Sequence, residues 1–233
     1  MIPNRYAYMT GCLIFFIPWT ILFWKRKDLR REMLVMGLIA GIVSYASAYF
    51  WTMDWWRPQT ITGTRLGIED FILGISNGGI AAVLYEEIFR KKLYRKRTKN
   101  DKRYFYFLVC ITFLLFYVFY RVFKTTTFYA CIFSLLIYCG FMLITRKDLI
   151  FSSLVNGLLM VLIAAPVYSL LILLSPGFVN STYIYKETLT GIRVFSVPVE
   201  EFVFYFVFGF MVALMYEYWH GLGLRNFARA KNS

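Results

Sequence analysis

The stretch SVPVEEFVFYFVFGFMVALMYEYWHG, residues 196–221, decides the fold of this chain. After two adjacent glutamates it continues with about 20 residues that are almost all aliphatic or aromatic, the length that an α-helix needs to cross a membrane. The same pattern predicts seven spans, at 8–24, 33–51, 68–89, 104–123, 128–145, 151–174 and 197–219. Of the 233 residues, 59% are hydrophobic and only 17% are charged, more apolar surface than a soluble domain can bury. We therefore expect an all-α integral membrane protein.

The basic residues indicate how the spans are oriented. Of the 26 Lys and Arg, 19 fall in the segments 25–31, 90–103, 146–147 and 225–231, which share one side of the membrane if all seven spans cross. The positive-inside rule then predicts an external N-terminus and a cytoplasmic C-terminus. The net charge of +13 is thereby explained by topology and by contact with anionic lipid, and we do not expect binding to nucleic acid.

An internal repeat organises the chain. RKDL occurs at 26–29 and at 146–149, and IEDF at 68–71 corresponds to VEEF at 199–202, 131 residues later. At that second offset, the YE pair at 85–86 matches the YE pair at 216–217. The sequence predicts a first three-helix repeat in 1–92, a basic loop and linker helix in 93–125, and a second three-helix repeat in 126–233. Because one linker span separates them, the copies should be parallel, related by an axis along the membrane normal.

Two further patterns concern helix packing. The segments GLIAG (37–41) and GISNG (74–78) have small residues four positions apart, which predicts a close approach of the second and third spans. Asn77 and Asn156 lie at lipid depth, and we interpret both as interhelical hydrogen-bonding residues.

Two acidic pairs, Glu69/Asp70 and Glu200/Glu201, open the third and seventh spans. One interpretation is structural, since the helix dipole favours acidic groups at an N-terminus and Pro198 suits a first turn. The other is catalytic. Adjacent carboxyl groups in a low-dielectric site cannot both ionise cheaply, so one keeps a proton that it can deliver even to an alkene. The sequence alone leaves both interpretations open.

Other residues near the pairs have alternative interpretations too. Aromatic rings follow the second pair at once, and they either stabilise a cation or belong to an interfacial aromatic belt. Arg65 and Arg193 either hold the acidic pairs in place or lie on the surface. At the far ends of the same helices, three glutamates either anchor the helices at the interface by pairing with Arg90 and Lys91 or take part in the site. These are Glu86, Glu87 and Glu217.

The pattern TGIR…VPVEEFVFYFVFGFMVALMYE resembles the membrane-embedded lycopene cyclase domain of the two-subunit or fused type. The signature of that family is Thr-Gly-x-Arg, then Pro-x-Glu-Glu, a Phe-rich helix and a closing Tyr-Glu. The second repeat carries it at Thr190, Gly191, Arg193, Pro198, Glu200, Glu201, Phe202, Tyr216 and Glu217. The first repeat matches more loosely, at Thr62, Gly63, Arg65, Glu69, Asp70, Phe71, Tyr85 and Glu86, and lacks the proline.

The resemblance implies a β-cyclisation of a linear carotenoid end group, a net isomerisation of the intramolecular lyase type that uses no cofactor. Glu200 or Glu201 would be the proton donor, and Glu69 and Asp70 the facing pair. Substrate-binding residues would be Phe202, Tyr205, Phe206, Arg193 and Arg65. The substrate would be a lipophilic polyene within the bilayer of the cell membrane, and a second copy or another cyclase subunit could be a partner. In agreement, the sequence contains no nucleotide-binding fingerprint, and the lone His220 cannot form a metal cluster.

Two other functions are compatible with seven spans. A small transporter can have the same three-one-three parallel repeat, although such proteins carry matched helix breakers and Pro18 and Pro166 fall in non-equivalent spans. A retinal-binding photoreceptor requires a lysine in the last span, and 197–219 contains none.

Overall fold

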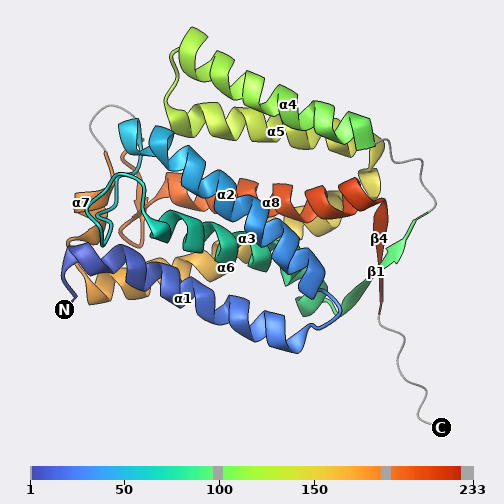
Figure 1. Ribbon diagram of the computed structural model, residues 1–233, viewed down its shortest axis with the longest axis horizontal. Coiled ribbons are helices and arrows are strands. Elements are labelled where there is room, and N and C mark those ends of the chain that lie inside the picture. The colour runs from blue at the N-terminus through green and yellow to red at the C-terminus, as the bar shows by residue number, and fades with distance from the viewer. Residues whose placement is uncertain (1, 97–101, 185–189, 227–233) are drawn as a thin grey trace.

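The computed structural model describes residues 2–96, 102–184 and 190–226, and over these ranges the chain forms a bundle of long helices (Figure 1). Seven of them are long and apolar enough to cross a membrane, which confirms the seven predicted spans. They are α1 (Asn4–Lys25), α2 (Arg30–Asp54), α3 (Ile68–Ile88), α4 (Lys102–Tyr117), α5 (Thr127–Thr145), α6 (Ile150–Leu174) and α8 (Val199–His220). Three short pieces join them: the π-helical turn η1 (Val118–Val122), the 3-10 turn η2 (Lys147–Leu149) and α7 (Phe178–Thr182).

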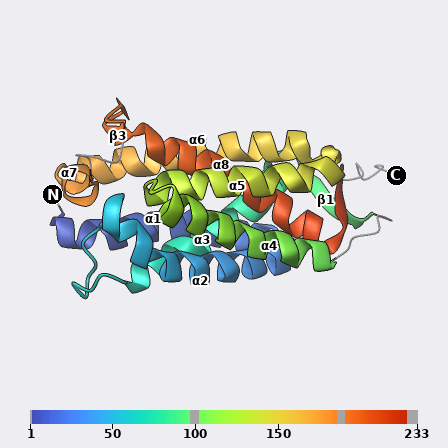
Figure 2. The same ribbon diagram turned by 90° about the horizontal axis from the view of Figure 1, so that it is seen from above.

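Helices α3 and α8 form the centre of the bundle. Helix α3 packs against α1, α2, α6 and α8, and α8 packs against α3, α5 and α6. Helix α4 lies at one edge of the bundle (Figure 1), where it packs mainly on α5, and it crosses in front of the other helices when the bundle is seen from that edge (Figure 2). The core therefore surrounds the two helices that carry the acidic pairs, with Ile80 and Val83 of α3 and Leu214 of α8 fully buried.

Small residues allow α2 and α3 to pack with their backbones nearly in contact. A Cβ atom added to Gly74 would lie 2.5 Å from the carbonyl oxygen of Ala40, and one added to Gly37 would lie 2.9 Å from that of Ile75. No larger side chain fits in either place without moving a helix. The close approach predicted from the two small-residue patterns is confirmed.

Two short ribbons mark opposite ends of the bundle. At the acid-pair end, where α3 and α8 begin, β2 (Arg193–Val194) pairs with β3 (Val197–Pro198). At the opposite end, here called the ribbon end, β1 (Lys91–Arg95) pairs antiparallel with β4 (Leu222–Asn226) (Figure 1). Leu93 lies opposite Leu224 at the middle of that ribbon. The sequence prediction contained no strand, because five polar and apolar residues at a helix end carry no clear alternation.

The two RKDL loops make matching contacts at the ribbon end. Arg26 donates to the backbone oxygens of Glu86 (2.9 Å) and Lys91 (2.8 Å). Arg146 donates to the backbone oxygens of Glu217 (3.3 Å) and Leu222 (2.5 Å). Each arginine thus joins the end of a central helix to the strand that follows it.

Within these loops, each arginine also binds the aspartate two residues later, Asp28 for Arg26 and Asp148 for Arg146. The hydrogen bond from Arg26 holds the pKa of Asp28 below its ordinary value.

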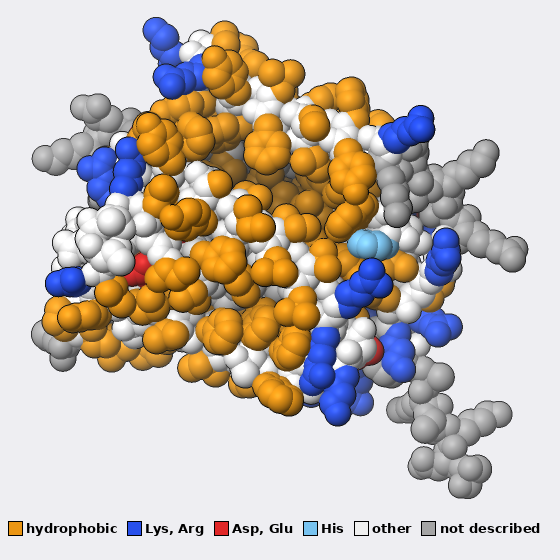
Figure 3. Space-filling model, viewed as in Figure 1, with side chains coloured by type: hydrophobic (Ala, Val, Ile, Leu, Met, Phe, Trp, Pro, Cys, Tyr) orange, Lys and Arg blue, Asp and Glu red, His pale blue; other side chains and the backbone are white. Residues whose placement is uncertain are grey.

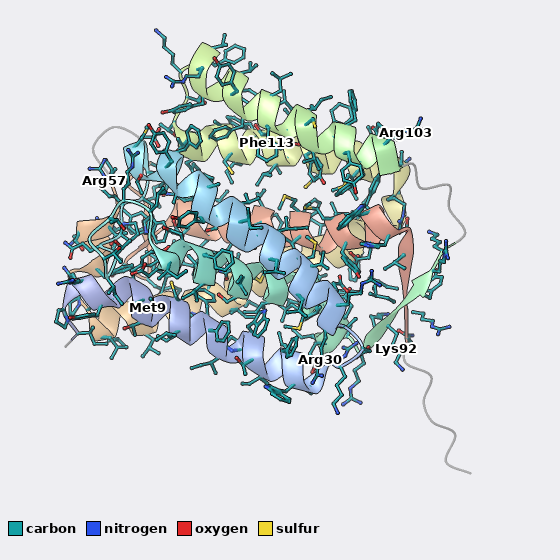
Figure 4. All side chains as sticks on the ribbon, in the orientation of Figure 1. Met9, Arg30, Arg57, Lys92, Arg103 and Phe113 are labelled. Carbon is teal, nitrogen blue, oxygen red and sulfur yellow. The ribbon has the colours of Figure 1, made fainter. Side chains whose placement is uncertain are left out.

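The surface of the bundle is apolar between its two ends. In Figure 3 hydrophobic side chains cover the middle of the visible face, and Lys and Arg gather toward its ends. Figure 4 places Arg57 at the acid-pair end and Arg30, Lys92 and Arg103 at the ribbon end, with Phe113 on the edge helix α4 between them. This is the surface of a multi-pass membrane protein, with its apolar band against lipid.

Candidate active site

All four acidic side chains predicted for the site are buried at the N-termini of the two central helices. Glu69 and Asp70 on α3 are 0% and 4% exposed, and Glu200 and Glu201 on α8 are 2% and 4% exposed. None of the four side chains is exposed, and Asp70 also accepts a hydrogen bond from the backbone N–H of Gly67 at 3.0 Å, so it caps α3 while being buried.

The first acid of each pair is held by the loop that precedes its helix. Glu69 Oε1 accepts a hydrogen bond from the backbone N–H of Ile61 at 2.6 Å. Glu200 Oε1 accepts from the backbone N–H and the hydroxyl of Thr190, both at 2.7 Å. In each case the second oxygen, Oε2, is buried and has no hydrogen-bond partner among the residues that the structure describes. These carboxyl groups therefore fix the loops on the helix ends and keep one oxygen unpaired in the interior.

Turning these loops back over the helices requires glycine. Gly63 and Gly191, the glycines of TGTR and TGIR, have φ angles of +71° and +76°. This left-handed region is costly for a residue with a Cβ atom. The Thr-Gly-x-Arg part of the family signature is thereby explained by backbone geometry.

The second acid of each pair accepts a hydrogen bond from a buried tyrosine. The Tyr8 hydroxyl of α1 donates to Asp70 Oδ1 at 2.6 Å, and the Tyr168 hydroxyl of α6 donates to Glu201 Oε2 at 2.7 Å. Tyr183, just after α7, lies 3.3 Å from Tyr168, oxygen to oxygen. Burial raises the pKa of Tyr183 well above its ordinary value, so its hydroxyl stays protonated and available as a donor. Sequence reasoning missed these tyrosines because they lie on helices remote in sequence from the acids.

The two tyrosine–acid pairs meet at one small apolar cavity. Tyr8 and Tyr168 both line it, together with apolar groups that include Cys12, Phe15 and Tyr205. Its volume is about 20 Å³, room for roughly one water molecule, whereas a cavity that holds benzene measures about 150 Å³. The cavity therefore marks where the two halves of the site meet, and it has to widen several-fold before it can hold an organic ring.

Of the three aromatic residues predicted to bind substrate, only Tyr205 lines this cavity, with its ring stacked on Phe15 at 5.7 Å. Phe206 faces α6, where its ring and backbone occupy the space that a side chain at Gly157 would need. Phe202 packs, partly buried, against the main core. Consecutive side chains of a helix point in different directions, so these three rings of α8 lie in different surroundings.

The two predicted arginines lie away from the cavity. Arg65 hydrogen bonds to the Thr52 hydroxyl and to the backbone oxygen of Tyr49, at the end of α2. It borders an open polar hollow of about 870 Å³ at the acid-pair end of the molecule. Arg193 is exposed and donates to Asn180 at 3.1 Å. Both arginines thus occupy surface positions, and tyrosine hydroxyls and backbone N–H groups hold the acids instead.

A second set of buried carboxyl groups lies at the ribbon end, and there the interfacial-anchor expectation is wrong for Glu86 and Glu217. They are 2% and 1% exposed, so neither side chain lies at the surface. Among the described residues, Glu87 forms ion pairs with Lys25 and Arg26 rather than with the expected Arg90 and Lys91, and Lys91 bonds to Asn226. The YE pairs at 85–86 and 216–217 were the sequence signal that these positions are equivalent.

Asn156 connects the helices at the middle of the bundle. Its side chain donates to the backbone oxygens of Ala81 and Gly209, each at 2.8 Å, and accepts from the N–H of Tyr85 at 3.1 Å. The interhelical role predicted for this residue is confirmed, and it joins α6 to both central helices.

Comparison with known proteins identifies the family. The family model for lycopene cyclase matches residues 6–88 and 124–219, most of the chain, and leaves out β1, α4, η1 and β4. Neither the curated proteins nor the solved structures yielded a match. With buried acidic pairs, the Thr-Gly-x-Arg loops and seven apolar helices already in place, the match leads to a single conclusion: the chain belongs to the lycopene cyclase family.

Proposed function

We propose that this membrane protein is a carotenoid β-cyclase that closes the linear end group of a lycopene-type polyene by acid–base catalysis alone. The observation that carries the proposal is the hydrogen bonding of two buried acids, Asp70 and Glu201, by the tyrosines Tyr8 and Tyr168, which both line one small apolar cavity. Family membership favours this function over transport. The absence of any nucleotide-binding fingerprint from the sequence supports chemistry without a cofactor.

The reaction follows from what a buried carboxylic acid can do. A protonated carboxyl group of the Glu200/Glu201 pair gives its proton to the terminal alkene, whose π electrons form the new C–H bond and leave a tertiary cation. The π electrons of a nearby alkene then attack that cation, which closes the six-membered ring and moves the positive charge into it. A carboxylate removes a ring proton, and the C–H electron pair becomes the ring double bond. Atoms balance, and the enzyme ends with the proton it began with.

The surroundings suit each charge in this sequence. Water would quench the cation, and the cavity is lined almost entirely by apolar groups. The face of the Tyr205 ring, which lines the cavity, can stabilise the cation by about 2 kcal/mol when water is excluded from the contact. The hydroxyl of Tyr168 stabilises the carboxylate that forms when Glu201 loses its proton. Glu69 and Asp70 of the facing pair tune this charge or accept the returning proton.

We also propose that the chain is two parallel three-helix repeats with α4 as linker, an external N-terminus and a cytoplasmic C-terminus. The ribbon supports this arrangement, because Leu93 pairs with Leu224, the residue 131 positions later, which is the offset of the second half of the sequence repeat. A two-fold axis through that pair relates β1 to β4 and places Glu86 and Glu217 at equivalent positions. The clustering of basic residues at the ribbon end supports a cytoplasmic position for that end.

The substrate is proposed to enter from the bilayer, since a long polyene is insoluble in water and the bundle presents an apolar band to lipid. The surrounding lipids, and a second copy or another cyclase subunit, are the proposed partners in the cell membrane.

The test is expression in cells that accumulate lycopene, followed by chromatography of the extracted pigments. Wild type should produce a ring-containing carotenoid, and Glu201→Gln and Glu200→Gln should be compared with it at equal amounts of membrane-inserted protein. Loss of the ring in at least one variant supports the donor assignment, whereas rings in both variants at the wild-type rate would refute it. A well-expressed wild type without any ring product would refute the proposed function itself.

A further inference from the structure

The loop that leads into α8 contains a hairpin that the first repeat does not have. The offset between the two copies rises from 128 residues at TGTR and TGIR to 131 at IEDF and VEEF, so the second copy has three more residues between these motifs. In the first copy the chain passes from TGTR to α3 through Leu66 and Gly67 alone. In the second copy it forms the strands β2 and β3, which are joined by Phe195 and Ser196. The added residues therefore supply the hairpin.

The turn of this hairpin contains a residue that the turn disfavours. The φ angles of Phe195 and Ser196 are +51° and +63°. Positive φ at both central residues is the mark of a type I′ turn, in which Asn and Gly are strongly preferred. A bulky side chain is rare in this left-handed region, because its Cβ atom crowds the backbone. The conformation of the turn therefore does not explain why Phe195 is there.

Packing within the chain does not explain Phe195 either. It is 78% exposed, the highest fraction of any large apolar residue in the part of the chain that the structure describes. Ile192 and Val194 are 58% and 41% exposed, whereas Val197 on the other strand is fully buried. Phe195, Ile192 and Val194, here called the hairpin tip, thus present three apolar side chains to the outside of the molecule.

The hairpin stands at the side of the bundle. Figure 2 shows it projecting past α6, across the direction of the long helices, at the end where α8 begins. For helices that cross a membrane, this is the level of the lipid headgroups, and an element that projects sideways there points into lipid. Exposed Phe and aliphatic side chains are typical of segments that bind at this boundary. Three side chains are too few for a stable protein interface, which takes about 20–30 residues a side.

We propose that the hairpin tip inserts into the boundary between headgroups and acyl chains, in the leaflet at the acid-pair end, and anchors the loop 190–198 to the membrane. Burial of Phe195 in lipid offsets the strain of its turn. The same loop binds a residue of the site, because the backbone N–H and the hydroxyl of Thr190 both donate to Glu200 Oε1 at 2.7 Å. The backbone N–H of Val199 in turn donates to the oxygen of Ile192 at 3.0 Å. The anchored tip therefore keeps in place the segment that holds Glu200. The inference depends on the chain crossing a membrane and is independent of the reaction proposed above.

The experiment measures the surroundings of the tip with nitroxide spin labels. Phe195→Cys and Ile192→Cys are labelled in the full chain, which is reconstituted into vesicles of phosphatidylcholine and phosphatidylglycerol. Collisions of each label are measured with oxygen, which concentrates among acyl chains, and with a water-soluble nickel complex. Cys110 and Cys131, the cysteines that are not buried, are first replaced by Ala, and this parent chain is the blank. Thr64→Cys is the matched control, because Thr64 is exposed and has the place of Ile192 in TGTR.

The expected result is that labels at Phe195 and Ile192 collide more often with oxygen than with the nickel complex, whereas the label at Thr64 does the reverse. Size-exclusion chromatography in detergent checks folding, and Ile192→Cys, which keeps Phe195, covers the case of a Phe195 variant that does not fold. Frequent collisions with the nickel complex at both hairpin positions, as at Thr64, would overturn the inference by placing the tip in water. Few collisions with either reagent would overturn it too, because protein, such as a second copy of the chain, would then cover the tip.

Discussion

Replacing Tyr168 by Phe tests whether Glu201 takes part in proton transfer. The change removes one oxygen atom and leaves the ring in place, and the atom removed is the donor to Glu201 Oε2 at 2.7 Å. Tyr183 stays nearby but loses its own contact with Tyr168. The perturbation is therefore confined to the hydrogen bonds around one carboxyl group.

The expected size of the effect follows from that bond. A hydrogen bond to a charged group contributes about 1.5–3 kcal/mol, and this stabilisation applies only after Glu201 has given up its proton. Losing it raises the barrier to protonation of the alkene by up to the same amount, which slows cyclisation about 10- to 150-fold. A merely structural role would lower stability and leave the rate per folded molecule unchanged.

The assay is the initial rate of ring formation in membranes supplied with lycopene, divided by the amount of folded protein. Tyr138→Phe is the matched control, because Tyr138 is also buried and its hydroxyl bonds to no residue within 2–96, 102–184 and 190–226. That control should keep the wild-type rate. If Tyr168→Phe and Tyr138→Phe have the same rate per folded molecule, the assignment of Glu201 to proton transfer is wrong.

Three further predictions concern the scaffold. Gly78→Leu should lower the free energy of unfolding by about 1–3 kcal/mol, because the new side chain meets the backbone oxygen of Met36 on α2. Gly140→Ala is the control, since a Cβ atom there meets open space, and it should leave the free energy of unfolding unchanged. Both are measured by thermal unfolding in detergent. Asn156→Leu should cost about 2 kcal/mol, from three interhelical hydrogen bonds of about 0.6 kcal/mol each; an unchanged unfolding midpoint would contradict this. The pKa of Asp28 is held below its ordinary value of 3.8, so its contribution is present above that pH and is lost as the pH falls through the lower folded-state value. Asp28→Asn should therefore be less stable than wild type at pH 7 and equal to it at the acid end, and a difference independent of pH would count against this ion pair.

The helices of this protein could be predicted from sequence, and the reason is physical. A membrane span must satisfy all its backbone hydrogen bonds internally, so length and hydropathy suffice to locate it, and all seven predicted spans are observed. The glycine contacts between α2 and α3 were also predictable, because small residues four positions apart in a membrane helix are typical of close helix packing. What the amino-acid pattern could not supply was which partner each buried acid would find.

The candidate site illustrates that limit. The four acids were identified as a set because the repeat places them equivalently, and all four are buried. The sequence offered Arg65 and Arg193 as possible partners, since opposite charges lie nearby in sequence, and a surface position as the alternative. In the structure, hydroxyl groups from α1 and α6 take that place. A tyrosine does not neutralise a carboxylate, but its neutral side chain costs far less to bury than the charged side chain of an arginine. Which residue bonds to each acid depends on how helices distant in sequence pack together.

The equivalent positions of the two repeats separate scaffold from chemistry. Arg26 and Arg146, and likewise Glu86 and Glu217, are retained at matching places, and they make matching contacts. The matching positions also differ: Tyr8, which donates to Asp70, is matched by Phe128, and Asn156, which connects α6 to both central helices, is matched by Met36. The two halves of the sequence repeat therefore share the contacts that hold the helix ends but not the groups around their buried acids. Matching variants in the two halves should for that reason differ in their effect on activity.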